Sequence, residues 1–318
     1  MTKNLSTPRK VIVVLGPTAS GKSDLAVKIA KKIFAFGGGE IISADSRQVY
    51  RGLDIGSGKI TKKEMQGISH YLINVASPKR IFTVSQYQKL AKKALADILK
   101  RGKIPIICGG TGLYIDSIIY NTKFPEVPPQ PKLRKKLEKL STEELFKKLQ
   151  KLDPQRAKNI DYHNRRRLIR ALEIIITTGK PVPNILATID GNKNIPYKIL
   201  KIGIKKSPEE LKKLIKKRLL ARLRGKNNMI KEVENLHQNP PVGGGLSWQR
   251  LDNLGLEYRY VSRYLRGLIT KKEMIEILEK EIWRYAKRQM TWFKRDQNII
   301  WTDSPQKVFS TIQGWLVP

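Results

Sequence analysis

The stretch at positions 16–23, near the N-terminus, constrains the fold of this chain most strongly. It follows the apolar run 11–15 and matches the pattern G-x-x-x-x-G-K-S. Glycines in this pattern let backbone N–H groups surround an anion, and the helix that follows adds its positive N-terminus. We therefore expect a strand, a phosphate-binding loop and a helix. The residues of this phosphate loop are Gly16, Pro17, Thr18, Ala19, Ser20, Gly21, Lys22 and Ser23.

Two side chains of the phosphate loop carry most of its expected chemistry. Lys22 is placed to act as a point charge for the outer phosphates, and the Ser23 hydroxyl is placed to bind Mg²⁺. The loop predicts nucleotide or diphosphate binding, with ATP as the generic ligand. A glycine turn that binds nothing is the alternative, and the loop by itself does not identify the phosphate.

Composition limits the class of protein. The chain has 318 residues, of which 40% are hydrophobic, so it can bury a core. Its one cysteine excludes an internal disulfide framework and a cysteine zinc site. No apolar run is long enough to span a membrane, and the first ten residues lack the apolar region of a signal peptide. We expect a cytoplasmic protein with no membrane partner.

Net charge indicates the kind of partner. The chain carries 63 lysines and arginines against 27 acidic residues, a formal charge of +36. Such an excess favours a polyanion such as nucleic acid, because binding releases condensed counterions. A general preference for lysine on every surface is the alternative explanation.

Apolar segments alternate with helical ones along the first part of the chain. Buried strands are expected at 11–16, 40–45, 70–75 and 104–108, with a helix at 86–101 before the last of them. This alternation predicts an α/β fold with a parallel sheet covered by helices, like that of P-loop NTPases. Ligands of such sheets bind at the carboxyl ends of the strands, where the phosphate loop, Asp45 and the turn at 109–111 should meet.

A second region interrupts this pattern. Four prolines lie between positions 125 and 131, and a charged helical stretch follows from about 132 to 178. We interpret residues 125–195 as a helical insertion. Residues 1–124 and 196–318 then form the P-loop catalytic core, since 197–204 has the pattern of a returning strand.

Asp45 is the strongest candidate for a reactive group. It ends the second expected strand and faces the phosphate loop, where a carboxylate can hold Mg²⁺ or act as a general base. Asp is also a preferred helix cap, which is the structural alternative. The fourth strand ends in Cys-Gly-Gly rather than in an acidic residue, so the pattern does not separate a base from a metal ligand.

Two basic clusters point to an anionic partner. Arginines at 165–167 and 170 open a helix, where their charge opposes the helix dipole. The segment 271–295 predicts a long helix with one apolar face, and lysines and arginines on the opposite face suit an RNA backbone. A solvated basic face is the alternative for both clusters.

Several blocks, in this order, resemble those of the bacterial tRNA dimethylallyltransferase family. They are the phosphate loop and the segments 42–59, 109–114, 166–173 and 285–293. The resemblance spans about residues 10–300 and is far more specific than the phosphate loop alone.

The resemblance implies a reaction and its catalytic residues. The phosphate loop would hold dimethylallyl diphosphate with Mg²⁺ instead of ATP. Asp45 would be the base that removes a proton from the adenine N6. Thr18 would assist the leaving diphosphate, and Lys22 and Arg218 would neutralise it. Arg222 remains the alternative to Arg218, because the segment 218–229 is longer than the family norm.

The resemblance also implies the partner. The target is adenosine 37 in the anticodon stem-loop of tRNAs that read codons beginning with U, and the enzyme is expected to be a monomer. The base must leave its stack to reach the diphosphate. Leu256 stands where the family commonly has Tyr. The residues expected to contact tRNA are Asp45, Ser46, Arg47, Gln48, Thr111, Arg134, Arg166, Arg167, Leu168, Ile169 and Arg170.

Three other functions remain open at this point. A prenyltransferase acting on a free adenine nucleotide would share the chemistry but would not need the arginine-rich insertion. A P-loop kinase or ATPase would be expected to have an acidic residue at the end of the fourth strand. A nucleic-acid-binding protein without catalysis would not need both an intact phosphate loop and Asp45.

Overall fold

The computed structural model describes residues 9–183, 197–238 and 244–317. The chain divides into two compact units. The first, here the core unit, comprises Met1–Ile119 and Ile195–Pro318, and the second, the insertion unit, comprises Tyr120–Asn194. Positions 184–195 of the insertion expected at 125–195 lie outside the described residues.

The core unit contains a parallel sheet of six strands. In space their order is β3-β2-β4-β1-β5-β6, and every neighbouring pair is parallel. The expected α/β fold is therefore confirmed. The strands are β1 (Arg9–Leu15), β2 (Gly39–Ser43), β3 (His70–Tyr71), β4 (Ile104–Gly109), β5 (Tyr197–Ile204) and β6 (Ile299–Thr302).

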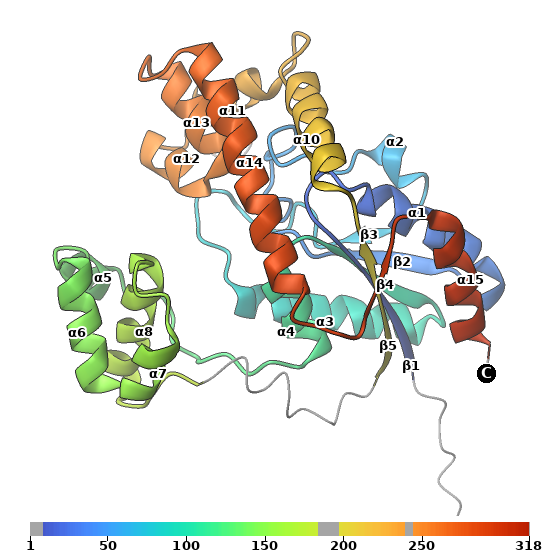
Figure 1. Ribbon diagram of the computed structural model, residues 1–318, viewed down its shortest axis with the longest axis horizontal. Helices are drawn as coiled ribbons and strands as arrows, with labels where there is room; N and C mark the ends of the chain where they lie inside the picture. The colour runs from blue at the N-terminus through green and yellow to red at the C-terminus, as the bar shows by residue number, and fades with distance from the viewer. Residues whose placement is uncertain (1–8, 184–196, 239–243, 318) are drawn as a thin grey trace, which may run out of the picture. The chain divides into compact units, whose positions relative to one another are not determined.

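Helices cover both faces of the sheet (Figure 1). On one face, α1 (Lys22–Lys32) and α15 (Pro305–Leu316) pack on alternate residues of β1, β4 and β5 in one apolar cluster. On the other, α3 (Val84–Lys100) and α4 (Gly112–Ile119) contact each other and β4. Because both faces are buried, β1 from Val11 onward and β4 consist almost entirely of apolar residues.

A group of helices lies beyond the carboxyl ends of the strands (Figure 1). Strand β5 leads into α10 (Pro208–Arg222), which begins at the cap residue Ser207. The longest helix, α14 (Lys271–Phe293), begins with a capping box of Thr270 and Glu273 and packs on α10 and α13. The group also contains α11 (Met229–Gln238), α12 (Trp248–Leu254) and α13 (Leu256–Leu265). Two short helices, η1 (Phe34–Phe36) and α2 (Lys62–Met65), complete the unit.

The described residues of the insertion unit are mainly helical. Its helices are α5 (Pro131–Leu137), α6 (Thr142–Leu152), α7 (Pro154–Asn159) and α8 (Arg165–Thr178). Leu145, Leu149, Leu168 and Leu172 form the centre of its apolar core. In neither unit do the described residues include a helix with the length and apolarity needed to cross a membrane.

A fully buried carboxylate organises the insertion unit. Glu173 of α8 accepts two hydrogen bonds from Arg134, at 2.7 Å each, and one from Arg170, at 2.6 Å. The backbone N–H of Gln130 donates a further bond of 2.6 Å. Although burial disfavours the charged form, these donors lower the pKa of Glu173 to about 2.

We predict that Glu173→Gln destabilises the protein by roughly 3 kcal/mol, because it leaves two partly buried arginines without their counter-charge. The lowered pKa means that the ionised group stabilises the fold above its unfolded value near 4.5, and that this contribution disappears as the pH falls toward 2. Urea unfolding from pH 3 to 7 measures both effects. The difference in free energy of unfolding between wild type and Glu173→Gln should decrease toward pH 3, whereas the exposed control Glu143→Gln should match wild type at every pH. A gap that stays constant with pH contradicts this account.

Candidate active site

The phosphate loop has the backbone of an anion-binding site. Ala19 and Gly21 adopt left-handed φ angles of 63° and 87°, and Gly21 caps the N-terminus of α1 without a side-chain hydrogen bond. Among the described residues, the buried Ser20 hydroxyl has no hydrogen-bond partner. An unsatisfied hydroxyl beside a helix N-terminus indicates that the loop is built to receive an anion.

Lys22 lies at the first position of α1. Its ammonium group donates to the carbonyl oxygen of Pro17 at 3.2 Å. Burial lowers the pKa of Lys22, and the nearby Arg218 lowers it further. A bound anion would reverse this effect, since it favours the charged form.

Gln289 of α14 holds the phosphate loop from the other side. Its Oε1 accepts from the N–H of Thr18, and its Nε2 donates to the carbonyl of Gly110, both at 2.8 Å. A side chain at Gly110 would collide with this amide, since its Cβ would lie 2.2 Å from Nε2. One buried glutamine thus connects the loop after β1, the turn after β4 and the long helix.

Asp45 lies just beyond the end of β2, as the sequence predicts. Its Oδ1 accepts hydrogen bonds from the N–H groups of Arg47, at 2.8 Å, and Gln48, at 3.3 Å. Its Oδ2 has no hydrogen-bond partner among the described residues. The carboxylate therefore fixes the turn at 45–48 with one oxygen and keeps the other available for chemistry.

The turn at 45–48 is tied to the end of β4. Thr111 accepts a hydrogen bond from the N–H of Ser46 at 3.0 Å and donates its own N–H to Ala44 at 3.1 Å. Gly109 permits this approach, because a Cβ there would lie 2.1 Å from the Ala44 carbonyl oxygen. The structure thus brings together the carboxyl ends of β2 and β4.

The geometry separates the two candidate arginines. The guanidinium of Arg218 lies 3.5 Å from the Thr18 hydroxyl and donates to the Gly58 carbonyl at 3.0 Å. Arg222 instead forms an ion pair of 3.1 Å with Glu257 and donates to the Gly56 carbonyl. Arg218 is therefore the arginine that reaches the phosphate loop.

These groups line one cavity of about 500 Å³ in the core unit. Its wall combines the phosphate loop, the turn at 45–48, two arginines of α10, the start of α13 and the middle of α14. Burial raises the pKa of Tyr285, one of its lining residues, so this phenol stays neutral at ordinary pH. The charged lining residues are Lys22, Asp24, Asp45, Arg47, Glu64, Arg218, Arg222, Glu257, Arg259, Glu281 and Arg288.

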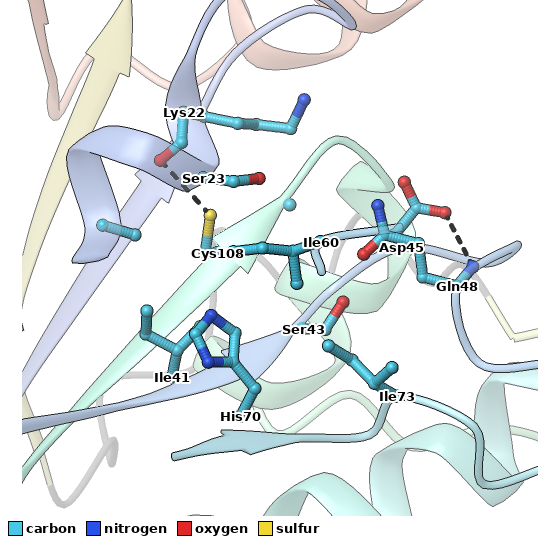
Figure 2. Close-up of a pocket in the computed structure, with 12 residues that line it drawn as sticks. Lys22, Ser23, Ile41, Ser43, Asp45, Gln48, Ile60, His70, Ile73 and Cys108 are labelled. Carbon is cyan, nitrogen blue, oxygen red and sulfur yellow. Dashed lines mark hydrogen bonds between the residues drawn. The ribbon is translucent and has the colours of Figure 1, made fainter. Parts of the chain in front are cut away.

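A second, smaller pocket adjoins the first (Figure 2). Both are lined by Lys22, Ser23, Asp45 and Gln48. Cys108 lines the smaller pocket near the end of β4, where P-loop kinases are expected to have an acidic residue. Burial raises the pKa of the Cys108 thiol to about 11, so it is a poor nucleophile.

The insertion unit uses several of the predicted tRNA-binding residues internally. Leu168 and Ile169 are buried in its apolar core, and Arg134 and Arg170 bind Glu173. In this structure, their side chains are part of the unit's own packing. The two exposed residues of the predicted set are Arg166 and Arg167.

The basic face of α14 lies on the surface of the core unit. Its lysines and arginines are exposed, whereas Leu278, Ile282, Ala286 and Phe293 are buried. The two-faced pattern expected for 271–295 is confirmed. The exposed residues are Lys280, Arg284, Lys287 and Arg288 of α14, with Lys294 and Arg295 directly after it.

Together, this fold and site define a class of protein. A parallel sheet carries an anion-binding loop, a carboxylate with one available oxygen and a buried arginine, all around one cavity at its carboxyl edge. Such a site suits an enzyme that acts on a phosphorylated substrate and stabilises a phosphate or diphosphate group.

Comparison with known proteins narrows this class. The family model described as IPP transferase matches residues 48–296. The chain is 40% identical to the tRNA dimethylallyltransferase of Acetivibrio thermocellus over 316 residues, covering 96% of this chain and 97% of that protein. It is 43% identical to the tRNA dimethylallyltransferase of Thermoanaerobacter sp. over 297 residues, covering 92% and 91% of the two chains.

Solved structures agree with these relatives. The tRNA isopentenylpyrophosphate transferase of Bacillus halodurans superposes with a TM-score of 0.67 at 33% identity, covering 97% of each chain. A eukaryotic dimethylallyltransferase, described as acting on tRNA, superposes with a TM-score of 0.75 at 26% identity, covering 97% of this chain and 79% of the other. The chain belongs to the IPP transferase family and is a prenyltransferase.

The sequence patterns did not predict roles for Gln289, for Glu257, or for Glu232, whose carboxylate accepts hydrogen bonds from the backbone N–H groups of residues 54–56. Gln289 had a recognisable signal, because it is a polar residue in the buried stripe of α14 formed by Ile282, Ala286 and Phe293. The two glutamates act through segments distant in sequence, so no local pattern marks them.

We predict that Gln289→Met weakens binding of inorganic pyrophosphate at least about tenfold and destabilises the fold by roughly 1–3 kcal/mol, because the Thr18 N–H and the buried Gly110 carbonyl lose their partner. Titration calorimetry and urea unfolding measure the two effects. The exposed control Gln297→Met should change neither. Wild-type pyrophosphate affinity in the Gln289 variant would show that this glutamine does not shape the phosphate loop.

Proposed function

We propose that this enzyme transfers the dimethylallyl group of dimethylallyl diphosphate to N6 of adenosine 37, in tRNAs that read codons beginning with U. The observation that carries the proposal is the single cavity that joins the phosphate loop, the available oxygen of Asp45 and the Arg218–Thr18 pair. The sequence and structure of the named tRNA dimethylallyltransferases support it further.

In this reaction the adenine N6 attacks the first carbon of the allyl group. The new N–C bond forms, the C–O bond to the diphosphate breaks, and one N6 proton must leave. Oδ2 of Asp45 accepts that proton, while Oδ1 stays bonded to the turn at 45–48. Asp45 is thus held in place by the same turn that is proposed to contact the tRNA.

The departing diphosphate gains negative charge as the C–O bond breaks. Lys22 and Arg218 neutralise this charge, and the Thr18 hydroxyl beside Arg218 donates to it. The N–H groups at the start of α1 complete the anion site. Preorganised donors of this kind stabilise the transition state more than the bound substrate.

The start of α1 also offers an oxygen ligand suited to Mg²⁺. Mg²⁺ in phosphate sites commonly has one or two protein oxygens and otherwise takes phosphate oxygens and water. The Ser23 hydroxyl would be one ligand, and phosphate oxygens and water would supply the others. When bound, the ion would offset part of the charge on the diphosphate.

The tRNA partner is proposed to contact both units through its anticodon stem-loop. On the core unit, the contacts are Asp45, Ser46, Arg47, Gln48 and Thr111, which lie at the cavity or support the turn beside it. On the insertion unit, Arg166 and Arg167 are exposed. All residues proposed for the reaction come from one chain, which supports a monomer; we infer that it acts in the cytoplasm.

The test is transfer of labelled dimethylallyl to an unmodified tRNA with adenosines at positions 36–38, in the presence of Mg²⁺. We expect Asp45→Asn to lower the transfer rate by about 100-fold or more, the usual contribution of a general base. Its tRNA affinity should stay within about twofold of wild type, because asparagine retains the Oδ1 that bonds the turn.

Each other outcome identifies an alternative. Label in adenosine monophosphate with none in tRNA indicates a prenyltransferase of free nucleotides. Phosphate release from ATP without transfer indicates a kinase or ATPase. Near-wild-type transfer by the Asp45 variant removes the proposed base but leaves the reaction in place.

Arg167 tests the role of the insertion unit. We expect Arg167→Gln to weaken tRNA binding and to reduce the slope of log affinity against log salt by about 0.7–0.9, the loss of one phosphate contact. The matched control is Lys93→Gln, which removes one exposed charge from α3 of the core unit. Equal slopes for the Arg167 variant and wild type would show this arginine to be merely solvated.

A further inference from the structure

A second polar network lies behind the two arginines of the cavity. The carboxylate of Glu232, on α11, accepts hydrogen bonds from the N–H groups of Asp54, Ile55 and Gly56 at 2.5–2.9 Å. The hydroxyl of Tyr258 donates to the same carboxylate and accepts from the N–H of Ser57, both at 3.0 Å. These contacts fix the backbone of residues 54–58, here the 54–58 loop.

The fixed loop in turn receives both arginines of α10. Arg222 donates to the carbonyl of Gly56 at 3.1 Å, and Arg218 donates to that of Gly58 at 3.0 Å. A Cβ on Gly58 would lie 2.0 Å from one guanidinium and 2.1 Å from the other. Only glycine, here at a φ of 59°, leaves room for both guanidinium groups to approach the backbone at this position.

Glu257 is the carboxylate that accompanies this pair. It binds Arg222 at 3.1 Å, and both side chains are nearly buried, with 12% and 13% of their surface exposed. Its place at the start of α13 depends on an unusual backbone. Gly255 and Leu256 have φ angles of 76° and 41°, and the second is strained for a bulky residue. Strain of this kind persists where a site requires a particular orientation.

We propose that Glu257 is a positioning residue for Arg218. It restrains Arg222 against the 54–58 loop, so that the guanidinium of Arg218 alone extends toward Thr18 and the phosphate loop. The inference rests on the proposed function for its importance to catalysis, but the network itself is independent of the RNA.

The charges around Arg218 give the proposal a measurable consequence. Burial and the neighbouring Arg222 lower the pKa of Arg218 to about 10, while Glu257, Asp45 and Glu64 raise it. Lys22 is a further cation close to this group. Removing the Glu257 charge should therefore make Arg218 lose its proton at a lower pH, and removing Arg222 should have the opposite effect.

The primary experiment measures the affinity of the whole protein for pyrophosphate by titration calorimetry at a series of pH values from 7 to 11. In Glu257→Gln the affinity should begin to fall at a pH lower than in wild type by about half a unit to one unit. In Arg222→Gln the affinity should begin to fall at a higher pH than in wild type. In the double variant, which combines Glu257→Gln with Arg222→Gln, it should begin to fall at the wild-type pH or above it. The titrations of pyrophosphate itself and of Lys22, whose pKa burial also lowers, are common to all four proteins, so the differences between them report on Arg218.

Kinetics provide the second readout. We expect Glu257→Gln to reduce kcat at least about tenfold while the KM for the diphosphate stays within about threefold, because the released Arg222 still attracts the anion. Glu257→Asp, which keeps the charge, should recover part of kcat. Glu210→Gln, which removes an exposed ion pair at the start of α10, the helix that carries Arg218 and Arg222, should behave as wild type.

The outcomes separate this inference from the function. Wild-type pH dependence and kcat in a folded Glu257→Gln overturn the positioning role. If that variant does not fold, as judged by circular dichroism, the double variant decides, since it leaves no unpaired buried charge. In that case the affinity of the double variant must begin to fall at or above the wild-type pH, and Glu257→Asp must retain part of the wild-type kcat, or the inference fails. If neither wild type nor any variant modifies tRNA, but the pH at which pyrophosphate affinity falls changes among the variants as expected, the proposed function is wrong and the positioning role of Glu257 is supported.

Discussion

The active site depends on holding cations together against their own repulsion. Lys22, Arg218 and Arg222 line one cavity in the core unit. Burial and mutual repulsion lower the pKa values of Lys22 and Arg218. Such a cluster persists only where the surrounding structure restrains every member. The phosphate loop restrains Lys22, and the 54–58 loop restrains the two arginines of α10.

Carboxylates that are buried or largely buried supply restraint of a similar kind in both units. Glu40 binds Arg101 and Lys103 beside the sheet, Glu173 binds two arginines of the insertion unit, and Glu257 binds Arg222. Glu232 instead collects three backbone N–H groups. In a chain with 63 basic and 27 acidic residues, each buried carboxylate therefore has a large effect on local geometry. The surplus charge lies on faces such as that of α14, where water and salt screen it.

The sequence predicts the fold well because the relevant signals are local. Apolar runs identify β1, β2 and β4, the G-x-x-x-x-G-K-S pattern identifies the turn into α1, and Gly179 marks the end of α8. The place of Asp45 at the carboxyl edge follows from the parallel topology alone. The partners of Gln289 and Glu257 could not be predicted in this way, since they lie between 35 and 271 positions away. The arginines of α8 show the same limit, because pattern does not distinguish Arg170, bound to Glu173, from the exposed Arg167.

A site of this kind is incomplete without its anion. The unpartnered Ser20 hydroxyl, the N–H groups at the start of α1 and the crowded cations are all unfavourable for an empty cavity and favourable for a diphosphate. Because binding relieves this repulsion only in the folded state, a diphosphate should also stabilise the fold. In the proposed reaction the relief is greatest as the C–O bond breaks, since the diphosphate then carries its largest charge. The carboxylates hold the cations close together despite their repulsion, and this same cluster of cations is what most favours departure of the leaving group.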